Sequence, residues 1–583
     1  MEIPANMSES FKYSKDKEGS ITQPQLPEKT FVQNYVSRPN SLCCKLSQYT
    51  WHDGLDTFFT HQVPFSYSTS LNLANKYLNL IQAYYHNCDK DILHVVELGA
   101  GLGLLSFHIC LLLEEQEHPL FKKIKFTITD SSNALVDTIH HHPLYNRYKE
   151  HVSWQAFDCL GDDYSLINQA SVVIMNYVCD AFATHHMEYN NNTLYEWNMA
   201  TYFNNSDYFF DTQTFPPRFY KETSLHDYLK TLTTANFSTN TPKNLLRLSH
   251  LLKEDWKKNL AKDCFSKHNY DAISTFMQKT NIPAKQRFNF SFELDTVMRS
   301  ILTNLQTNSL VLIYDFGIPK WSDKYLSKNL YYSQYGMNLF YTTNFTHLRY
   351  LADHYHYSNL MTHFKNGNSQ LLALFNNNKA LKSLEAAFTS HFSKPYKSPK
   401  LAKTLRGYVS WATYCSKYYK QLPDTEKYSY MILVSLAECL VQNNDLNAAE
   451  YYLTKLENHF GTFARSGFYL KAKMLNQQKR YDECVSFIHA RALTTCSHSG
   501  ILYEYLVALC YSNNLSLFIT TFKHYLTTTD YHIPWRFFLI TLFILNSQKN
   551  ADHALEIIQW LKSMIKKFPE VVPQTLHSEI NAL

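Results

Sequence analysis

The feature that most constrains the fold is a cluster of glycines between two apolar runs. Three of the 13 glycines in this 583-residue chain fall within residues 99–103. The run before them, Leu93–Leu98, is short and rich in β-branched residues, which is typical of a strand buried on both faces. The run over residues 102–115 has the apolar spacing of a helix. The sequence therefore predicts a strand–turn–helix unit, and the free backbone N–H groups at its helix start can meet a ligand.

The spacing of the glycines distinguishes among possible ligands. A dinucleotide fingerprint requires G-x-G-x-x-G, but Leu104 stands where the third glycine would fall, and no Gly-Lys-Ser/Thr of a P-loop follows. Glu97-x-Gly99-x-Gly101-x-Gly103 instead resembles motif I of the class I S-adenosylmethionine-dependent methyltransferases. The resemblance implies that the turn cradles the amino-acid part of the cofactor and that Glu97 helps hold its charged end. The alternative is a structural turn in an α/β domain without a ligand.

Acidic or amide residues follow the next predicted strands. Asp130 ends the alternating stretch KIKFTITD, Asp158 follows a short apolar strand, and Asn176 ends a buried run. Ligands of open α/β sheets bind at such strand ends, and an acid after the second strand can accept both ribose hydroxyls. In the methyltransferases that motif I resembles, an acid at the place of Asp158 pairs with the adenine amino group. The residues expected to bind the cofactor are Glu97, Gly99, Ala100, Gly101, Gly103, Asp130, Ser131, Asp158, Cys159 and Asn176.

The stretch after the fourth predicted strand indicates a resemblance to one particular family of these methyltransferases. VIMNYVCDAFATHHMEYNNNTLYEW resembles the fourth-motif region of the family that includes the mitochondrial complex I assembly arginine methyltransferase and its bacterial, MidA-like relatives. Asn176, Asp180 and the Tyr-Glu pair at 195–196 match that pattern, whereas Ala183 replaces the usual proline. Further on, SLVLIYDFGIP resembles the family's strand that ends in Asp-Tyr-Gly, with Asp315 as its acid. The resemblance also implies a lead-in helix after Thr69-Ser70, a helix start at Asn344-Phe345 and a closing strand over Ser369–Phe375.

These observations predict a domain organisation. Residues 1–40 are expected to be a polar, disordered lead-in, and residues 41–377 an α/β domain with a doubly wound, Rossmann-like methyltransferase sheet. An insertion at about 188–300 is expected to be mostly helical after an initial hairpin, with NLLRLSHLLKEDWKKNL as one helical segment. Either it helps to build the acceptor pocket, or it is a solvated excursion. Residues 378–583 are expected to form an all-α domain of helical repeats.

Small and apolar residues recur in this C-terminal part at offsets near the ~34-residue tetratricopeptide period. Ala437 aligns with Ala472, and Ala449 aligns with Cys484. The further aligned positions are Leu440 with Leu475, Leu453 with Ile488, then Ala508 and Ala554. The Trp, Gly and Pro positions of the tetratricopeptide consensus are largely lost, so the repeats are described as tetratricopeptide-like. A helical solenoid offers a concave surface for a protein partner, and the alternative is a domain that only stabilises the enzyme.

Composition and residue clusters exclude several other classes of function. The net charge of +5 is small for this length and is dispersed, which argues against nucleic-acid binding. No apolar run approaches the ~20 residues of a membrane span, and the 12 scattered cysteines contain no CxxC pair, so a reducing, cytoplasmic location is expected. The histidine clusters at 140–142, 185–186 and 354–356 have no framework of metal ligands, so no metal is expected.

The sequence thus predicts a methyltransferase that uses S-adenosyl-L-methionine and acts on a protein side chain, with arginine favoured and the repeats recruiting the substrate or a partner. Methyl transfer is an in-line displacement, so the protein mainly aligns the reactants. If the acceptor is an arginine, Asp180 and Asp315 are the carboxylates expected to orient its guanidinium, with Asn176 as a further contact. His185 or His186 is a weaker candidate for a base. Two alternatives stay open, an inactive methyltransferase-fold scaffold and a small-molecule methyltransferase.

Overall fold

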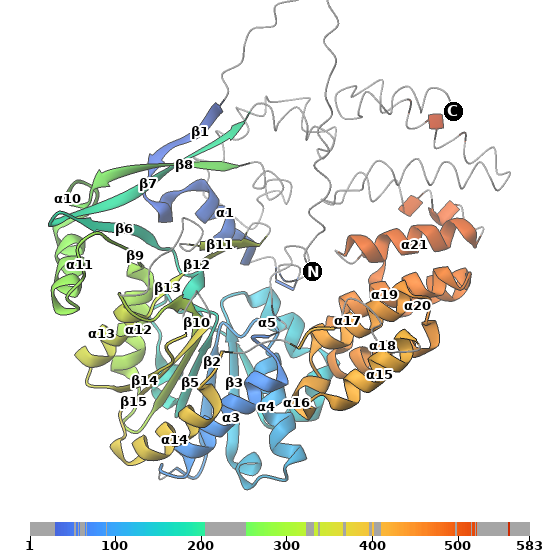
Figure 1. The fold of residues 1–583 in the computed structure, drawn as a ribbon, viewed down its shortest axis with the longest axis horizontal. Helices are drawn as coiled ribbons and strands as arrows, with labels where there is room; N and C mark the ends of the chain where they lie inside the picture. The colour runs from blue at the N-terminus through green and yellow to red at the C-terminus, as the bar shows by residue number, and fades with distance from the viewer. Residues whose placement is uncertain are drawn as a thin grey trace, which may run out of the picture.

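A computed structural model describes most of residues 29–521 of this chain. The gaps are 52–53, 56–57, 59–64, 66, 89, 205–251, 322–331, 336–337, 365–368, 396–398, 402–409, 496–497, 513, 515 and 519, and beyond 521 only Leu555, Ile558, Gln559 and Lys562 are described. Figure 1 shows a large sheet with helices, a second sheet beside its upper edge, and a group of helices on the opposite side. The expected disorder of residues 1–28 and the repeat position Ala554 lie outside the described residues.

The large sheet has eight strands, and its path runs β14-β15-β10-β5-β2-β3-β4, with β13 paired to β10. The strands are β2 (Leu93–Leu98), β3 (Ile124–Asp130), β4 (Val152–Ala156), β5 (Val172–Asn176), β10 (Leu310–Ile318), β13 (Thr343–Asn344), β14 (Ser358–Met361) and β15 (Ser369–Phe375). From β10 to β4 the neighbours are parallel, whereas β15 is antiparallel to both β10 and β14. The strand order reverses between β2 and β5, so the predicted doubly wound sheet is confirmed.

Helices cover both faces of this sheet. One face carries α3 (Leu71–Tyr85), α4 (Leu104–Glu115), α5 (Asn133–His140) and α14 (Leu381–Phe392), and the other carries α6 (Ser165–Gln169), α12 (Phe292–Asn304) and α13 (Phe345–His354). Successive strand residues point to opposite faces, so Val95 packs into the first core and Val96 into the second. The expected helix starts are confirmed, because Ser70 caps α3 and Asn344 caps α13 with their side chains.

The second sheet has five strands in the order β1-β7-β6-β9, with β8 paired to β7. They are β1 (Lys29–Val36), β6 (His185–Asn190), β7 (Thr193–Asn204), β8 (Lys253–Leu260) and β9 (Gln286–Phe290), and α10 (Ala261–Cys264) and α11 (Lys267–Lys279) pack beside them. A small hairpin of β11 (Tyr332–Tyr335) and β12 (Asn338–Tyr341) contacts α1 (Leu42–Thr50).

Two expectations were wrong in this region. The helix predicted through residues 244–260 is a strand over its described end, β8, because pairing with the long strand β7 outweighs the weak helical periodicity there. The insertion therefore contributes a sheet as well as helices, rather than being mostly helical over the part that the structure describes. Residues 29–36, placed in the disordered lead-in, form β1 because they add an edge strand to β7.

The C-terminal described residues are helical. The helices are α15 (Trp411–Gln421), α16 (Asp424–Lys427), α17 (Tyr430–Gln442), α18 (Leu446–Phe460), α19 (Arg465–Gln477), α20 (Tyr481–Ala490) and α21 (Ser499–Tyr511). Short turns join α17 to α18 and α19 to α20, as in helical hairpins. Ala437, Ala449, Ala472, Cys484 and Ala508 are each fully buried, which confirms that these predicted positions lie where helices pack closely.

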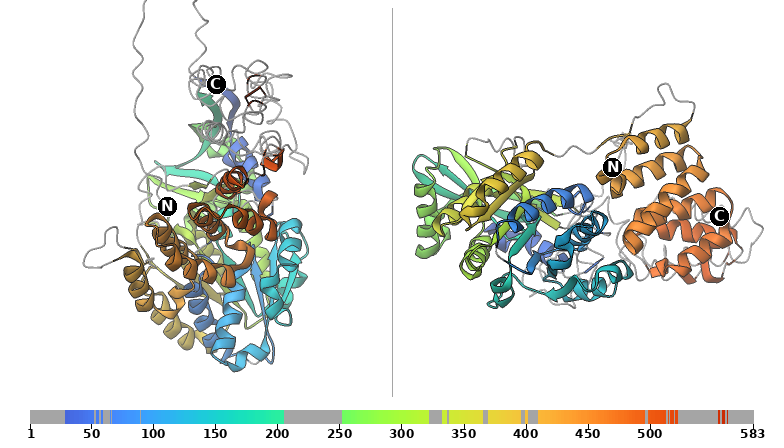
Figure 2. Two further views of the ribbon diagram at one scale, coloured as in Figure 1. Left: turned by 90° about the vertical axis from the view of Figure 1, so that its right-hand side faces the viewer. Right: turned by 90° about the horizontal axis from the view of Figure 1, so that it is seen from below.

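The helical part packs against the α3 and α4 side of the large sheet (Figure 2). Side chains of both parts form one continuous apolar core. At the junction the ring of His142 stacks on Phe463 with centroids 4.1 Å apart, and Asn72 donates a hydrogen bond of 2.9 Å to Glu426. His108 of α4 and His459 of α18 share a hydrogen bond between their Nε2 atoms, which lie 2.9 Å apart.

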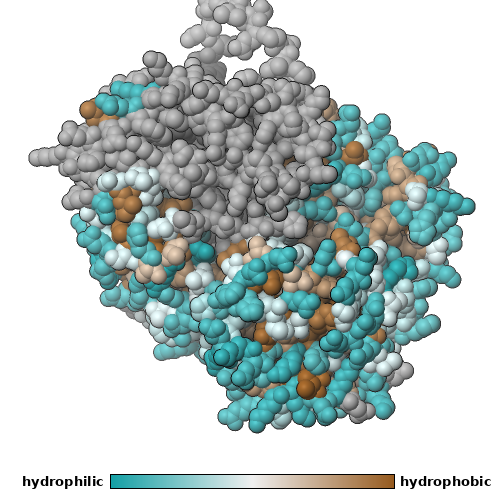
Figure 3. Space-filling view, turned by 180° about the vertical axis from the view of Figure 1, so that it is seen from behind, coloured by the Kyte–Doolittle hydropathy of each residue, from teal (hydrophilic) through white to brown (hydrophobic). Residues whose placement is uncertain are grey.

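Figure 3 shows one face of the surface, where the coloured residues are mainly hydrophilic and the hydrophobic ones form small separate patches. Within the part of the chain that the structure describes, no helix has both the length and the apolar composition that crossing a membrane requires.

Candidate active site

A cavity of about 680 Å³ opens at the carboxyl ends of β2 and β5, where the strand order reverses. Open α/β sheets bind their ligands at this switch point. The predicted site residues that line the cavity are Glu97, Gly99, Ala100, Gly101, Asp130, Ser131, Asp158, Cys159, Asn176 and Asp180. The structure thus brings together strand ends that are up to 83 residues apart in sequence.

The glycine turn leaves no room for side chains. Gly99 and Gly101 have φ values of +56° and +55°, a region that L-residues rarely adopt. A Cβ on Gly99 would lie 2.8 Å from a methyl group of Val178, and one on Gly101 would lie 2.7 Å from the ring of Phe58. The turn therefore presents bare backbone to the cavity, which is what a closely approached ligand requires.

Two predicted site residues do not line the cavity. Gly103 precedes α4 with a φ of +66°, and a Cβ there would lie 2.3 Å from the ring of Trp154, so this glycine serves helix–sheet packing. Asp315 is fully buried in β10, and its two oxygens accept the backbone N–H groups of Asp180 (3.0 Å) and Phe316 (2.6 Å). Its contact with the site therefore passes through Asp180.

Three carboxylates line the cavity at or near the carboxyl ends of β2, β3 and β4. Asp130 accepts the N–H groups of Gly101 (3.1 Å) and Ser132 (3.0 Å), which fixes it beside the glycine turn. Asp158 accepts the N–H of Leu160 at 2.9 Å. Glu97 is 2% exposed, and burial raises its pKa to about 7 although Ser106 donates a hydrogen bond to it.

Asn176 and Asp180 line the cavity at and just after the carboxyl end of β5. Asn176 donates to the carbonyl of Ser68 at 2.6 Å. Asp180 is 2% exposed, and its Oδ1 has no hydrogen-bond partner. Burial raises the pKa of Asp180 to about 7, and burial together with the Asp180 carboxylate raises that of Asp315 well above its usual range. Asp180 and Asp315 thus form a buried pair of interacting carboxyl groups.

Sequence reasoning missed several lining residues. Trp51, Phe58 and Phe340 form an aromatic wall, and Trp51 meets Phe340 edge-on with ring centroids 5.6 Å apart. They come from segments with no motif, and only the tertiary fold brings them to the cavity. Glu293 also lines the cavity. An acid in the first turn of a helix is common because it complements the helix dipole, so the sequence offered no signal for a role in the site.

The two adjacent histidines after Asp180 have other partners. His185 forms a hydrogen bond with Glu196 at 2.6 Å, and His186 bonds Asn289 at 2.7 Å. Neither is among the described residues that line the cavity. No group of three or more metal-ligating side chains occurs within the described ranges.

Comparison with known proteins agrees with this geometry. Residues 73–356 match the model of a family described as "Putative S-adenosyl-L-methionine-dependent methyltransferase". This segment is a methyltransferase domain that uses S-adenosyl-L-methionine. No curated protein matches the chain.

Two solved structures of Burkholderia thailandensis proteins from one superfamily resemble the chain weakly. One is an uncharacterized ACR protein, with 10% identity, a TM-score of 0.37 and coverage of 58% of this chain and 87% of that one. The other, described in the words "likely methyl transferase", is bound to S-adenosyl-homocysteine, with 11% identity, a TM-score of 0.38 and coverage of 58% and 88%.

The residues of the methyltransferase domain fit the cofactor. The bare glycine turn admits its amino-acid part, and Glu97 is a buried carboxylate without a cationic partner in the described structure, which suits the cofactor's ammonium group. Asp130 stands at the end of β3, where a carboxylate can accept ribose hydroxyls, and Asp158 lines the same cavity.

Glu97→Gln should raise the stability of the free protein and weaken cofactor binding. Glu97 binds its proton more tightly in the folded than in the unfolded state, so the free energy of unfolding falls as the pH rises from about 4.5 to about 7. The variant should lose this part of the pH dependence, roughly 2–3 kcal/mol, and bind S-adenosylmethionine at least roughly 10-fold more weakly. Thermal unfolding between pH 5 and 8 and calorimetric titration measure the two effects. A variant with the wild-type pH dependence and affinity would contradict this role of Glu97.

Proposed function

We propose that the methyltransferase domain transfers a methyl group to a nitrogen of a cationic protein side chain, with arginine as the acceptor, and that the helical repeats recruit the protein that carries it. The observation behind the proposal is Asp180, a buried carboxylate that lines the cavity and whose Oδ1 accepts no hydrogen bond from a described donor. The described lining residues include five acids and no Lys, Arg or His. The positive charge of the bound cofactor offsets part of the negative charge of these acids, and a guanidinium group can pair with the remaining carboxylates.

The residues of this chain would act by orienting the acceptor and taking its proton. Bound S-adenosylmethionine supplies a methyl group on a positively charged sulfur. Asp180 accepts a hydrogen bond from the acceptor nitrogen and takes the proton that this nitrogen gives up, for which a pKa of about 7 is well matched. The backbone N–H of Asp180 donates a hydrogen bond to Asp315. This bond holds the backbone of Asp180, and with it the Asp180 carboxylate, in place. The wall of Trp51, Phe58 and Phe340 excludes water from the path of the methyl group.

The proposed recruitment by the repeats is supported by the arrangement of the C-terminal helices. Stacked helical hairpins present an extended surface to a partner, and the tetratricopeptide-like spacing predicts such a surface here. The reaction is placed in a reducing, cytoplasmic setting, which the scattered cysteines of the sequence favour.

The deciding experiment is methylation of peptides by the full chain with labelled S-adenosylmethionine. The substrates are a mixed arginine-containing peptide library, a matched library with lysine in place of arginine, and a third with citrulline. Label in the arginine library alone supports the proposal. Label in the lysine library alone would reassign the acceptor. Cofactor binding without label in any protein or peptide would favour the scaffold alternative.

A further inference from the structure

A second cavity, of about 760 Å³, lies at the junction between the helical part and the methyltransferase domain. Most of its described lining residues belong to α15, α16 and α18, and Glu115 at the end of α4 lines it from the other side. We call it the junction cavity. None of the predicted site residues is among its described lining residues, so the cofactor site does not account for it.

Lysines from three helices meet in the junction cavity. They are Lys420 of α15, Lys427 of α16 and Lys455 of α18. The acids among its described lining residues are Glu115 and Asp424, and Asp424 pairs with Lys427 at 2.7 Å. Neither Lys420 nor Lys455 has a carboxylate within ion-pair distance among the described residues. The junction cavity therefore carries an excess of positive charge, whereas the methyltransferase cavity is lined by acids.

Tyrosine rings form much of the wall of the junction cavity. Tyr419, Tyr451 and Tyr452 meet edge-on, with ring centroids 5.1–6.2 Å apart. The Lys455 ammonium lies over two of these rings, 5.0 Å from the centroid of Tyr451 and 5.7 Å from that of Tyr419. These cation–π contacts direct the ammonium without neutralising its charge. Tyr451 is 52% exposed, so its ring is open to a ligand.

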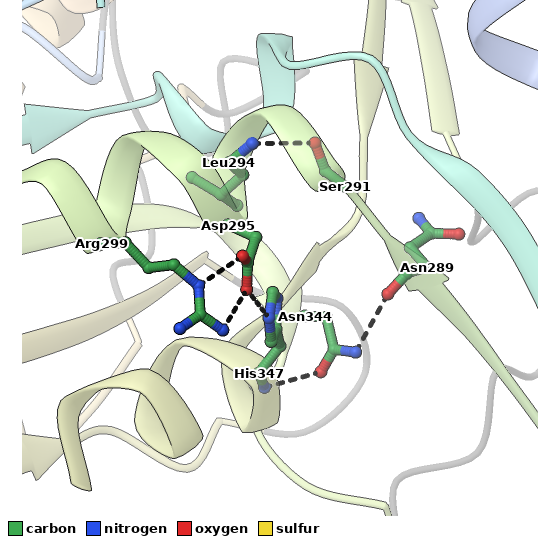
Figure 4. Close-up of polar contacts among 7 residues, drawn as sticks. All are labelled: Asn289, Ser291, Leu294, Asp295, Arg299, Asn344 and His347. Atoms are coloured by element: carbon green, nitrogen blue, oxygen red, sulfur yellow. Dashed lines mark hydrogen bonds and ion pairs between the residues drawn. The ribbon is translucent and has the colours of Figure 1, made fainter. Parts of the chain in front are cut away.

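The junction cavity differs from a charged cluster that is complete in itself, such as the one at the start of α12 (Figure 4). There Asp295 accepts two hydrogen bonds from Arg299 (2.6 and 3.2 Å) and lies 2.9 Å from Nε2 of His347. Each charge in that cluster has an opposite group of the same chain beside it. In the junction cavity, Lys420 and Lys455 leave two positive charges available to an anion.

The lining of the junction cavity favours the carboxylates of a peptide over a phosphate group. Phosphate sites commonly use arginine forks or a glycine-rich backbone at a helix start, and neither arginine nor glycine occurs among the described lining residues. Lysines are point charges, and these three come from separate helices, so they suit carboxylates that are spaced along a chain. The tyrosine rings can pack on the apolar stems of such a peptide.

The two cavities lie near opposite ends of α4. Glu115, the last residue of α4, lines the junction cavity, and the glycine turn before Leu104 lines the methyltransferase cavity. At 1.5 Å per residue, the 12 residues of α4 span about 18 Å. About six extended residues cover this distance, so one protein substrate can reach both cavities.

We propose that the junction cavity docks an acidic segment of the protein substrate while the acceptor arginine of the same protein enters the methyltransferase cavity. This inference rests on the proposed function and specifies what the helical repeats recruit, a protein with an arginine and a separate acidic segment. Because the two cavities carry opposite charges, such a substrate is attracted to them in one orientation and repelled in the reverse one.

The first test measures binding of a fluorescein-labelled hexaglutamate peptide to the full chain by fluorescence anisotropy at low ionic strength. The double variant Lys420→Gln, Lys455→Gln should bind at least roughly 5-fold more weakly than wild type, because two charged partners are lost. The matched control, Lys279→Gln with Lys382→Gln, changes exposed lysines of α11 and α14 and should stay within about 2-fold of wild type. No binding by wild type, or equal weakening in both double variants, would overturn the inference.

Competitors identify the chemical class of the ligand in the same experiment. Unlabelled hexaglutamate should displace the labelled peptide, and hexaglutamine should not, because it has the same length but no charge. Inorganic tripolyphosphate should displace it less effectively than hexaglutamate. Displacement by tripolyphosphate at a lower concentration than hexaglutamate would make the cavity a phosphate site and overturn its assignment to an acidic peptide.

A methylation assay links the junction cavity to the substrate. Arginine peptides carry a hexaglutamate or a hexaglutamine block, joined by a Gly/Ser linker of about 12 residues, whose average span of about 19 Å matches the length of α4. The glutamate block should lower KM at least roughly 5-fold in wild type and leave it unchanged in the double variant Lys420→Gln, Lys455→Gln. A block without effect in wild type, or with the same effect in both proteins, would contradict docking of the substrate here.

The two readouts distinguish failure of this inference from failure of the proposed function. If wild type methylates no peptide, the proposed function fails, and the anisotropy experiment alone decides whether the junction cavity binds an acidic peptide. If arginine peptides are methylated but hexaglutamate does not bind, the inference fails and the proposed function stands.

Discussion

Asp180→Asn is expected to lower the rate of methyl transfer at least about 100-fold and to leave the affinity for S-adenosyl-homocysteine within about 3-fold. Asparagine keeps the shape of the side chain and the backbone N–H that Asp315 accepts. It removes the negative charge that aligns a cationic acceptor, and it cannot take the proton that the acceptor nitrogen loses. Single-turnover methylation and calorimetric titration of the same preparations measure the two effects.

The pH dependence provides a second readout of Asp180. Because its pKa is raised to about 7, the carboxylate becomes ionised as the pH rises through neutrality, and the wild-type rate should increase from pH 6 to pH 8 before levelling. Asp180→Asn should lack this rise. The exposed Asp162 offers a matched control, since Asp162→Asn should leave both rate and pH profile unchanged. A variant at Asp180 that turns over at the wild-type rate would remove this residue from the mechanism.

The sequence predicted the glycine turn and the strand ends that line the cavity because local chemistry determines them. A strand, a turn with positive φ and a helix start are properties of consecutive residues, and Gly99 and Gly101 fill that turn as expected. Asp130 and Asp158 follow because parallel strands end at one edge. Gly103 shows where this reasoning fails. It was predicted to bind the cofactor, but the structure requires a glycine there for close packing against Trp154.

The rest of the cavity was harder to predict because it is assembled from distant segments. Glu293 reaches the cavity only through the packing of α12, and Phe58 only through the course of the chain before α3. The strand β8 was missed for a similar reason, as its partner β7 lies about 50 residues earlier and pairing overrides local periodicity. The burial of positions such as Ala449 was predictable because close helix packing requires small residues within one hairpin.

Gly101→Arg is expected to abolish cofactor binding, with a loss of affinity of at least roughly 100-fold. The residue has a φ of +55°, and its Cβ would lie 2.7 Å from the Phe58 ring, so any side chain is strained there. An arginine side chain would in addition occupy the space in front of the turn and bond the carboxylate of Asp130 that the cofactor needs.

Gly101→Ala tests whether backbone strain or the filling of the space in front of the turn causes the loss of binding. It shares the positive φ and the contact with Phe58 but adds only a methyl group, so its affinity should fall by roughly 10-fold, the cost of one strained residue. Calorimetric titration with S-adenosylmethionine compares the two variants, and thermal unfolding shows that both are folded. Binding by folded Gly101→Arg at wild-type affinity would mean that the cofactor does not lie against the turn. A large loss in both variants would instead make the backbone shape of residues 99–103, rather than free space, the main requirement for binding.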